Sequence, residues 1–84
     1  MNIIIMRTTK REAENIAYYA AGIVGTVRPA SSEAEPVRGL YSVMARQELL
    51  ADIQTLADAR GVRTAILAPQ DTIGQLREIK KALA

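Results

Sequence analysis

The chain has 84 residues, enough for one domain with a thin core, so we expect residues 1–84 to form a single domain. It contains no Cys and no His, which excludes disulfides and removes the commonest metal ligand and general base, so we expect no cofactor, no metal site and a reducing, cytoplasmic location. The net charge of +2 is well below that of a dedicated nucleic-acid binder, and the N-terminal apolar run is too short to span a membrane.

The first unit of the chain is predicted to be a strand followed by a helix. Residues 3–6 are apolar and mostly β-branched, as in a buried strand. Residues 9–12 match the Ser/Thr-x-x-Glu capping box that opens a helix, and Gly25 stands where a C-terminal cap is expected. Between these signals apolar residues recur at helical spacing, at Ala13, Ile16, Ala17, Ala20 and Val24.

The second unit is predicted to be a β-hairpin. A short strand at 26–28 is ended by Pro29, and the small, polar, proline-bounded stretch 30–36 is typical of an exposed loop. Residues 37–45 return to the composition of a strand. Because proline cannot donate to a strand ladder, we expect the first strand of this hairpin to lie at a sheet edge.

The remaining chain is predicted to form a helix, a strand and a last helix. Helical spacing returns from Arg46 and ends at Gly61, and a short apolar run follows at 62–68. A second capping box at 72–75 opens the last helix, which carries Lys80 and Lys81 near its C-terminus, where the helix dipole favours cations.

This order of elements predicts an α+β fold of the ferredoxin-like class, a βαββαβ antiparallel sheet with an extra C-terminal helix. The central strands would be those at 3–6 and 37–45. If the short strand at 26–28 did not form, the order would instead be three strand–helix units, which predicts a small flavodoxin-like, three-layer α/β fold with a parallel sheet.

Both faces of the predicted sheet are apolar, although an open antiparallel sheet normally alternates apolar and polar residues. The first strand, for example, places Ile3 and Ile5 on one face and Ile4 and Met6 on the other. The second face therefore needs a cover, for which there are two compatible candidates. One is the C-terminal helix folded back over the sheet, and the other is a second copy of the chain, so we expect a homodimer.

Basic residues are predicted to gather at one end of the sheet, where they could contact an acidic protein surface or phosphates. The end would contain Arg7, Lys10, Arg11, Arg28, Arg38, Arg60 and Arg63. Adjacent Tyr18 and Tyr19 cannot both face the core of one helix, and we expect Tyr19 to lie toward Ile16 and Ile23 and Tyr18 to be partly exposed. Tyrosine is common at interface hot spots. The predicted partner-binding residues are Lys10, Arg11, Tyr18, Arg28, Arg38 and Arg63.

No pattern in the sequence predicts an enzyme. Neither His nor Cys is available to activate a serine, and the glycines of Gly22-x-x-Gly25 lie at a helix end, not between a strand and a helix as a phosphate loop requires. We therefore expect a non-enzymatic interaction module that inhibits or regulates a larger protein with an acidic surface. Its size also fits small inhibitors from phages or mobile elements.

Two other functions remain open at this stage. The first is a nucleic-acid-binding protein that uses the same basic end, although the central strands carry only Tyr41 as a stacking aromatic. The second is a small-ligand regulatory domain of the ACT type, which has the same topology and could use Arg7, Thr8 and Thr9 at the start of the first helix.

Overall fold

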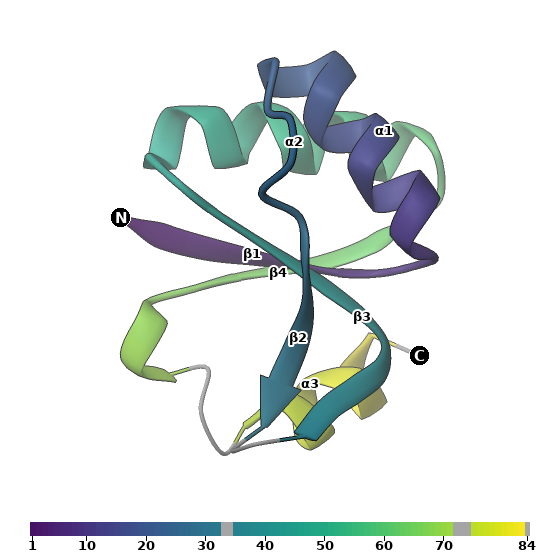
Figure 1. Ribbon diagram of the computed structural model, residues 1–84, viewed down its shortest axis with the longest axis vertical. Coiled ribbons are helices and arrows are strands. Elements are labelled where there is room, and N and C mark those ends of the chain that lie inside the picture. Colours follow the sequence, from purple (N-terminus) through teal and green to yellow (C-terminus); the bar gives the residue numbers. More distant parts are fainter. Residues whose placement is uncertain (33–34, 72–74, 84) are drawn as a thin grey trace.

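A computed structural model describes residues 1–32, 35–71 and 75–83 and contains the predicted order of elements (Figure 1). Residues 72–74, and with them most of the capping box predicted at 72–75, lie outside the described residues. None of the described helices has the length and hydropathy needed to cross a bilayer. The elements are β1 (Asn2–Arg7), α1 (Lys10–Ala21), β2 (Arg28–Ser32), β3 (Glu35–Ala45), α2 (Gln47–Ala59), β4 (Arg63–Leu67), the short 3-10 helix η1 (Pro69–Asp71) and α3 (Leu76–Ala82).

The four strands form one antiparallel sheet in the order β2-β3-β1-β4. This order, with β1 and β3 in the centre, confirms the ferredoxin-like prediction and excludes the parallel flavodoxin-like alternative. Ile5 marks the middle of the sheet, since it lies opposite Ser42 of β3 on one side and Ala65 of β4 on the other.

Helices α1 and α2 cover one face of the sheet, and α3 lies on the other (Figure 1). On the first face, Ile4 and Met6 of β1 are fully buried together with Ile16 of α1 and Leu50 and Ile53 of α2. The buried positions are i, i+3 and i+4 in α1 and i, i+3 and i+7 in α2, so each helix turns one apolar stripe toward the strands.

The C-terminal helix α3 lies on the second face, as the first of the two candidate covers predicted. Leu76 of α3 and Leu83, which caps the helix, are buried against Ile5 and Leu40. The helix packs on β2 and β3, and on the other half of this face β4 is only half-buried, at Ala65 and Leu67. One short helix thus covers about half of the second face.

The hairpin strand β2 begins later in the chain than predicted and contains Pro29. The predicted strand at 26–28 and the predicted loop at 30–36 were therefore wrong in position, because proline was taken as the end of a strand. β2 is an edge strand, where a residue without an N–H can be accommodated within the strand.

Helix α1 ends one turn earlier than predicted. Gly22, not Gly25, is its C-cap, with φ of 67° and an N–H that donates to the carbonyl of Tyr18 at 2.8 Å. Such a left-handed conformation suits glycine, which has no Cβ to clash. Val24, predicted to continue the buried stripe of the helix, is consequently 74% exposed.

Strand β3 contains an irregularity around Gly39, which has φ of 81°. The pairing of the hairpin shifts at this point, since Pro29 lies opposite Tyr41 whereas Ser31 lies opposite Pro36. The irregularity also breaks the alternation of side chains, because Val37 and Leu40 both pack into the cluster around α3. The hairpin thereby curls toward α3, as Figure 1 shows.

Candidate functional site

Six basic side chains gather at the end of the sheet where β1 ends and β4 begins; we call this group the basic end. Its position follows from strand register, since Arg7 is the partner of Leu40 in β3 and of Arg63 in β4. The Thr8 N–H also donates to the Gly39 carbonyl at 3.1 Å, which places Arg38 beside this row. The basic end comprises Arg7, Lys10, Arg11, Arg38, Arg60 and Arg63.

Lys10 and Arg11 are the first two residues of α1 and are both exposed. The helix begins there because the Thr9 hydroxyl accepts a hydrogen bond from the Glu12 N–H at 3.2 Å, as the capping box predicted. Two cations in a first turn lie near the positive end of the helix dipole, so they are mildly unfavourable for the helix itself.

Among the described residues, one ion pair involves the basic end. Arg60 pairs with Glu12 at 3.5 Å, and this is the single ion pair among the described residues. Within the same described part of the chain, the other five basic side chains of the end form no ion pair. Arg7 and Arg63 are moreover cross-strand partners, so two like charges lie directly opposite each other, an arrangement that lowers stability.

Arg28 does not belong to the basic end, contrary to its predicted position. It opens β2 opposite Ser42, in the row that contains Ile5 and Ala65. This row lies about 7 Å back from that of Arg7, and Arg28 is roughly 14 Å across the sheet from β4, given usual strand dimensions. The prediction failed because it placed the strand at 26–28, whereas β2 begins at Arg28 and ends at Ser32, so Arg28 was expected at the loop end of the hairpin.

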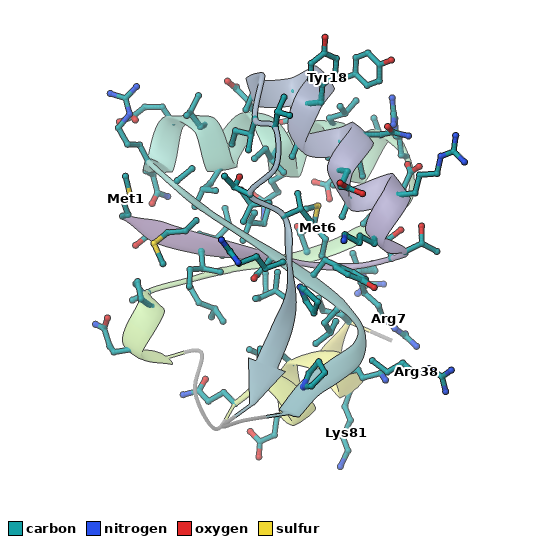
Figure 2. The ribbon with its side chains drawn as sticks, viewed as in Figure 1. Met1, Met6, Arg7, Tyr18, Arg38 and Lys81 are labelled. Atoms are coloured by element: carbon teal, nitrogen blue, oxygen red, sulfur yellow. The ribbon has the colours of Figure 1, made fainter. Side chains whose placement is uncertain are left out.

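Tyr18 is also separate from the basic end, about 12 Å along α1 from Lys10 by helical rise. Figure 2 shows Arg7 and Arg38 on one side of the molecule, with Lys81 near them below the sheet and Tyr18 at the far end above it. The predicted binding residues therefore fall into three groups. Lys10, Arg11, Arg38 and Arg63 are together, whereas Arg28 and Tyr18 each lie elsewhere.

Tyr18 instead belongs to an apolar surface, which we call the tyrosine patch: Tyr18, Tyr19, Ile23 and Val24. Tyr18 is 53% exposed as predicted, but Tyr19 is 68% exposed and does not face the core. The two rings meet edge to face with centroids 5.1 Å apart, and the Arg60 guanidinium lies 5.8 Å from the Tyr19 ring.

The exposure of Tyr19 could have been found in the sequence. The buried stripe of α1 is Ala13, Ile16 and Ala17, with Ala20 half-buried beside them. At 100° per residue, positions 18 and 19 both lie on the outward half of a helix with that stripe. The expectation that Ile23 continued the helix was the source of the error.

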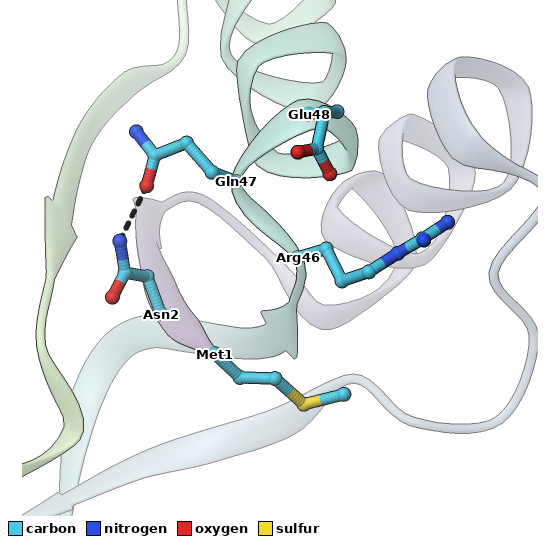
Figure 3. A pocket seen from close by; sticks show the side chains of 5 residues that line it. All are labelled: Met1, Asn2, Arg46, Gln47 and Glu48. Atoms are coloured by element: carbon cyan, nitrogen blue, oxygen red, sulfur yellow. Dashed lines mark hydrogen bonds between the residues drawn. The ribbon is translucent and has the colours of Figure 1, made fainter.

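Two shallow cavities lie away from the basic end. One, of about 390 Å³, is lined by the tyrosine patch together with Glu14, Asn15, Gly25 and Val27. The other, of about 290 Å³, lies at the start of α2 (Figure 3). In it Asn2 donates a side-chain hydrogen bond to Gln47, beside Met1, Arg46 and Glu48. No three acidic side chains of the described residues are close enough together to hold a metal ion.

Two of the three residues suggested for an ACT-type ligand site, Thr8 and Thr9, are engaged within the fold, whereas Arg7 is exposed. The Thr8 N–H bonds to the Gly39 carbonyl, and the Thr9 hydroxyl caps α1. Comparison of the chain with protein-family models, curated proteins and solved structures finds no match. The geometry of its own surfaces therefore carries the functional argument.

Proposed function

We propose that this protein is a non-enzymatic interaction module that binds an acidic surface of a larger protein through its basic end and thereby inhibits or regulates that partner. The observation that carries the proposal is the group of five basic side chains without an ion pair among the described residues. They come from β1, α1, β3 and β4, so the fold itself collects them on one surface.

The physical basis of the proposal is electrostatic complementarity. Like charges at Arg7 and Arg63 repel within the free protein, and carboxylates of a partner would relieve that repulsion. Arginine side chains also offer planar, bidentate contacts to carboxylates, which add geometry to charge.

Two observations favour a protein partner over a nucleic acid. The sheet face on which a ferredoxin-like domain could stack RNA bases is partly occupied by α3, through Leu76 and Leu83. Of the exposed aromatic rings among the described residues, Tyr18 lies about 12 Å along α1 from Lys10, and Tyr19 lies 5.8 Å from the guanidinium of Arg60. One ring beside one cation is not the row of rings on which successive bases stack.

The test is affinity capture from a lysate of the host with three tagged baits, each with and without nuclease. The baits are the natural sequence, Lys10→Glu/Arg11→Glu, and the control Arg28→Glu/Arg46→Glu, which reverses two exposed arginines outside the basic end and has the same net charge. We expect one stoichiometric protein that survives nuclease and is lost only with Lys10→Glu/Arg11→Glu.

Two results would contradict the proposal. If the captured material were lost on nuclease treatment, the basic end would bind nucleic acid. If both double variants lost the protein partner equally, net charge and not the basic end would direct binding.

A further inference from the structure

The two edges of the sheet differ in how they are protected. The β2 edge contains Pro29 and an irregular pairing between Pro29 and Ser31, both of which discourage the addition of another strand. The β4 edge has neither, since its sequence is Arg-Thr-Ala-Ile-Leu and it pairs with β1 in continuous register from Arg63 to Leu67. Within the described part of the chain, no strand lies on its outer side.

The side chains next to the open edge are also incompletely buried. Thr64, Ala65, Ile66 and Leu67 are all half-buried. Ala65 and Leu67 are on the face that carries α3, which packs mainly on the distant strands β2 and β3, whereas Thr64 and Ile66 are on the face that carries α1 and α2. An aliphatic strand with free backbone donors and acceptors at a sheet edge is a template for strand addition.

We infer that β4 pairs antiparallel with β4 of a second copy of this chain, joining the two sheets across a two-fold axis at Ala65. In this register no two charged side chains of the strand lie directly opposite each other. Full overlap sets Ala65 opposite its own copy, Thr64 opposite Ile66, and Arg63 opposite Leu67. The small side chain of alanine therefore lies on the axis, where two identical residues must fit.

The charges permit this register. Arg63 of one copy and Arg63 of the other would be separated by four strand positions, about 13 Å, which exceeds the Debye length at physiological salt. The aliphatic stem of each arginine would lie over the half-buried Leu67 of the other copy, while its guanidinium stays in water.

The helix above the edge leaves room for a second sheet. The Gln54 side chain donates a hydrogen bond to the Thr64 hydroxyl at 3.3 Å, so the flank of α2 that contains Gln54 lies over β4. One turn away on the same flank are Ala51 and Asp58, both exposed. This flank thus carries small or polar side chains and no bulky apolar group that would block a neighbour.

Cysteine cross-linking tests the pairing directly, since the natural chain has no Cys to interfere. Ala65→Cys should form a disulfide-linked dimer on mild oxidation, because residues directly opposite in an antiparallel pair lie within disulfide range. Arg63→Cys and Leu67→Cys should cross-link efficiently only when the two variants are mixed. The control Arg28→Cys, on the protected edge, should form no disulfide-linked dimer.

Solution mass completes the test. Light scattering on the natural chain should give twice the mass of one copy at high concentration. Ala65→Lys places two cations opposite each other on the axis, so this variant should have the mass of one copy and an unchanged circular dichroism spectrum. A natural chain that stays monomeric into the millimolar range, or Ala65→Cys that links no better than Arg28→Cys, would overturn the inference and leave the edge for a strand of another protein.

Discussion

Reversal of the two cations at the start of α1 should raise stability while it abolishes partner binding. Lys10 and Arg11 are the first two helical residues, immediately after the Thr9 cap. Each unfavourable cation–dipole interaction would become favourable, with about 0.3–1 kcal/mol per charge. New repulsion between the introduced glutamates and Glu14, one turn along the helix, would remove about 0.2–0.5 kcal/mol.

The net gain for Lys10→Glu/Arg11→Glu is then about 1 kcal/mol, which corresponds to a Tm increase of roughly 5 °C for a domain of this size. Thermal melts followed by circular dichroism at low salt would measure it, and the increase should shrink in high salt as the charges are screened. The neutral variant Lys10→Gln/Arg11→Gln should show about half the increase.

Binding to the captured partner should fall at least about tenfold in the same protein, equivalent to 1.4 kcal/mol or more. Because Tm is expected to rise while affinity falls, the two measurements together separate loss of contact from loss of structure. If Tm and affinity fell together, loss of structure would explain the loss of binding. If Tm rose and affinity stayed the same, Lys10 and Arg11 would be excluded from the interface.

Two further predictions concern the fold that holds these surfaces. Leu76→Ala should lower the free energy of unfolding by about 3–5 kcal/mol and undock α3, which is too short to persist alone. The Ile79 and Leu83 amides should then exchange rapidly in hydrogen-exchange NMR. If their protection equalled that in the exposed control Glu78→Ala, Leu76 would not anchor the helix. Thr9→Ala should lower the free energy of unfolding, measured by chemical denaturation, by about 1 kcal/mol, whereas Thr9→Ser should hardly change it, because only the serine variant keeps a capping hydroxyl. Equal losses in the two variants would mean that the hydroxyl has no capping role.

The sequence was sufficient for the order of elements because local signals agreed with one another. The capping box at Thr9, the helical stripes and the apolar runs each predicted a single type of element, and the order of these elements favoured the ferredoxin-like sheet over the parallel alternative, which stayed open because the strand at 26–28 had only a weak signal. The two apolar faces of the strand around Ile5 also predicted that the last helix would cover the sheet, and Leu76 and Leu83 do so.

The errors arose where the outcome depends on tertiary context. Proline within a strand is tolerated at an edge, so the position of β2 around Pro29 required knowledge of the sheet order. Gly22 and Gly25 both have positive φ, at 67° and 78°, so composition could not tell which one ends α1. Gly39 within the predicted strand is a local signal of an irregularity, but the sequence did not tell that Val37 and Leu40 would both pack in the cluster around α3.

These shifts explain which part of the candidate surface was predictable. Lys10, Arg11 and Arg63 stand at element boundaries with clear signals, and the topology alone brings them together. The position of Arg28 depended on the misplaced strand, and that of Tyr19 on the misplaced helix end. A surface built from loops at one end of a sheet is thus only as predictable as the boundaries that form it.

The two proposed surfaces can be separated experimentally, and their geometry suggests how they would act together. An antiparallel β4 pair directs the basic ends of the two copies to opposite ends of the joined sheet, because each basic end lies where its own β4 begins. Such a dimer could engage two acidic sites of one large assembly, and effective concentration would then strengthen each contact.

Arg63 contributes to both surfaces, whereas Lys10 belongs only to the basic end and Ala65 only to the open edge. A monomeric Ala65→Lys that still captures the partner, more weakly than the natural chain, would show that the basic end binds by itself and that dimerisation adds avidity. Unchanged capture by that monomer would show that the two surfaces act independently.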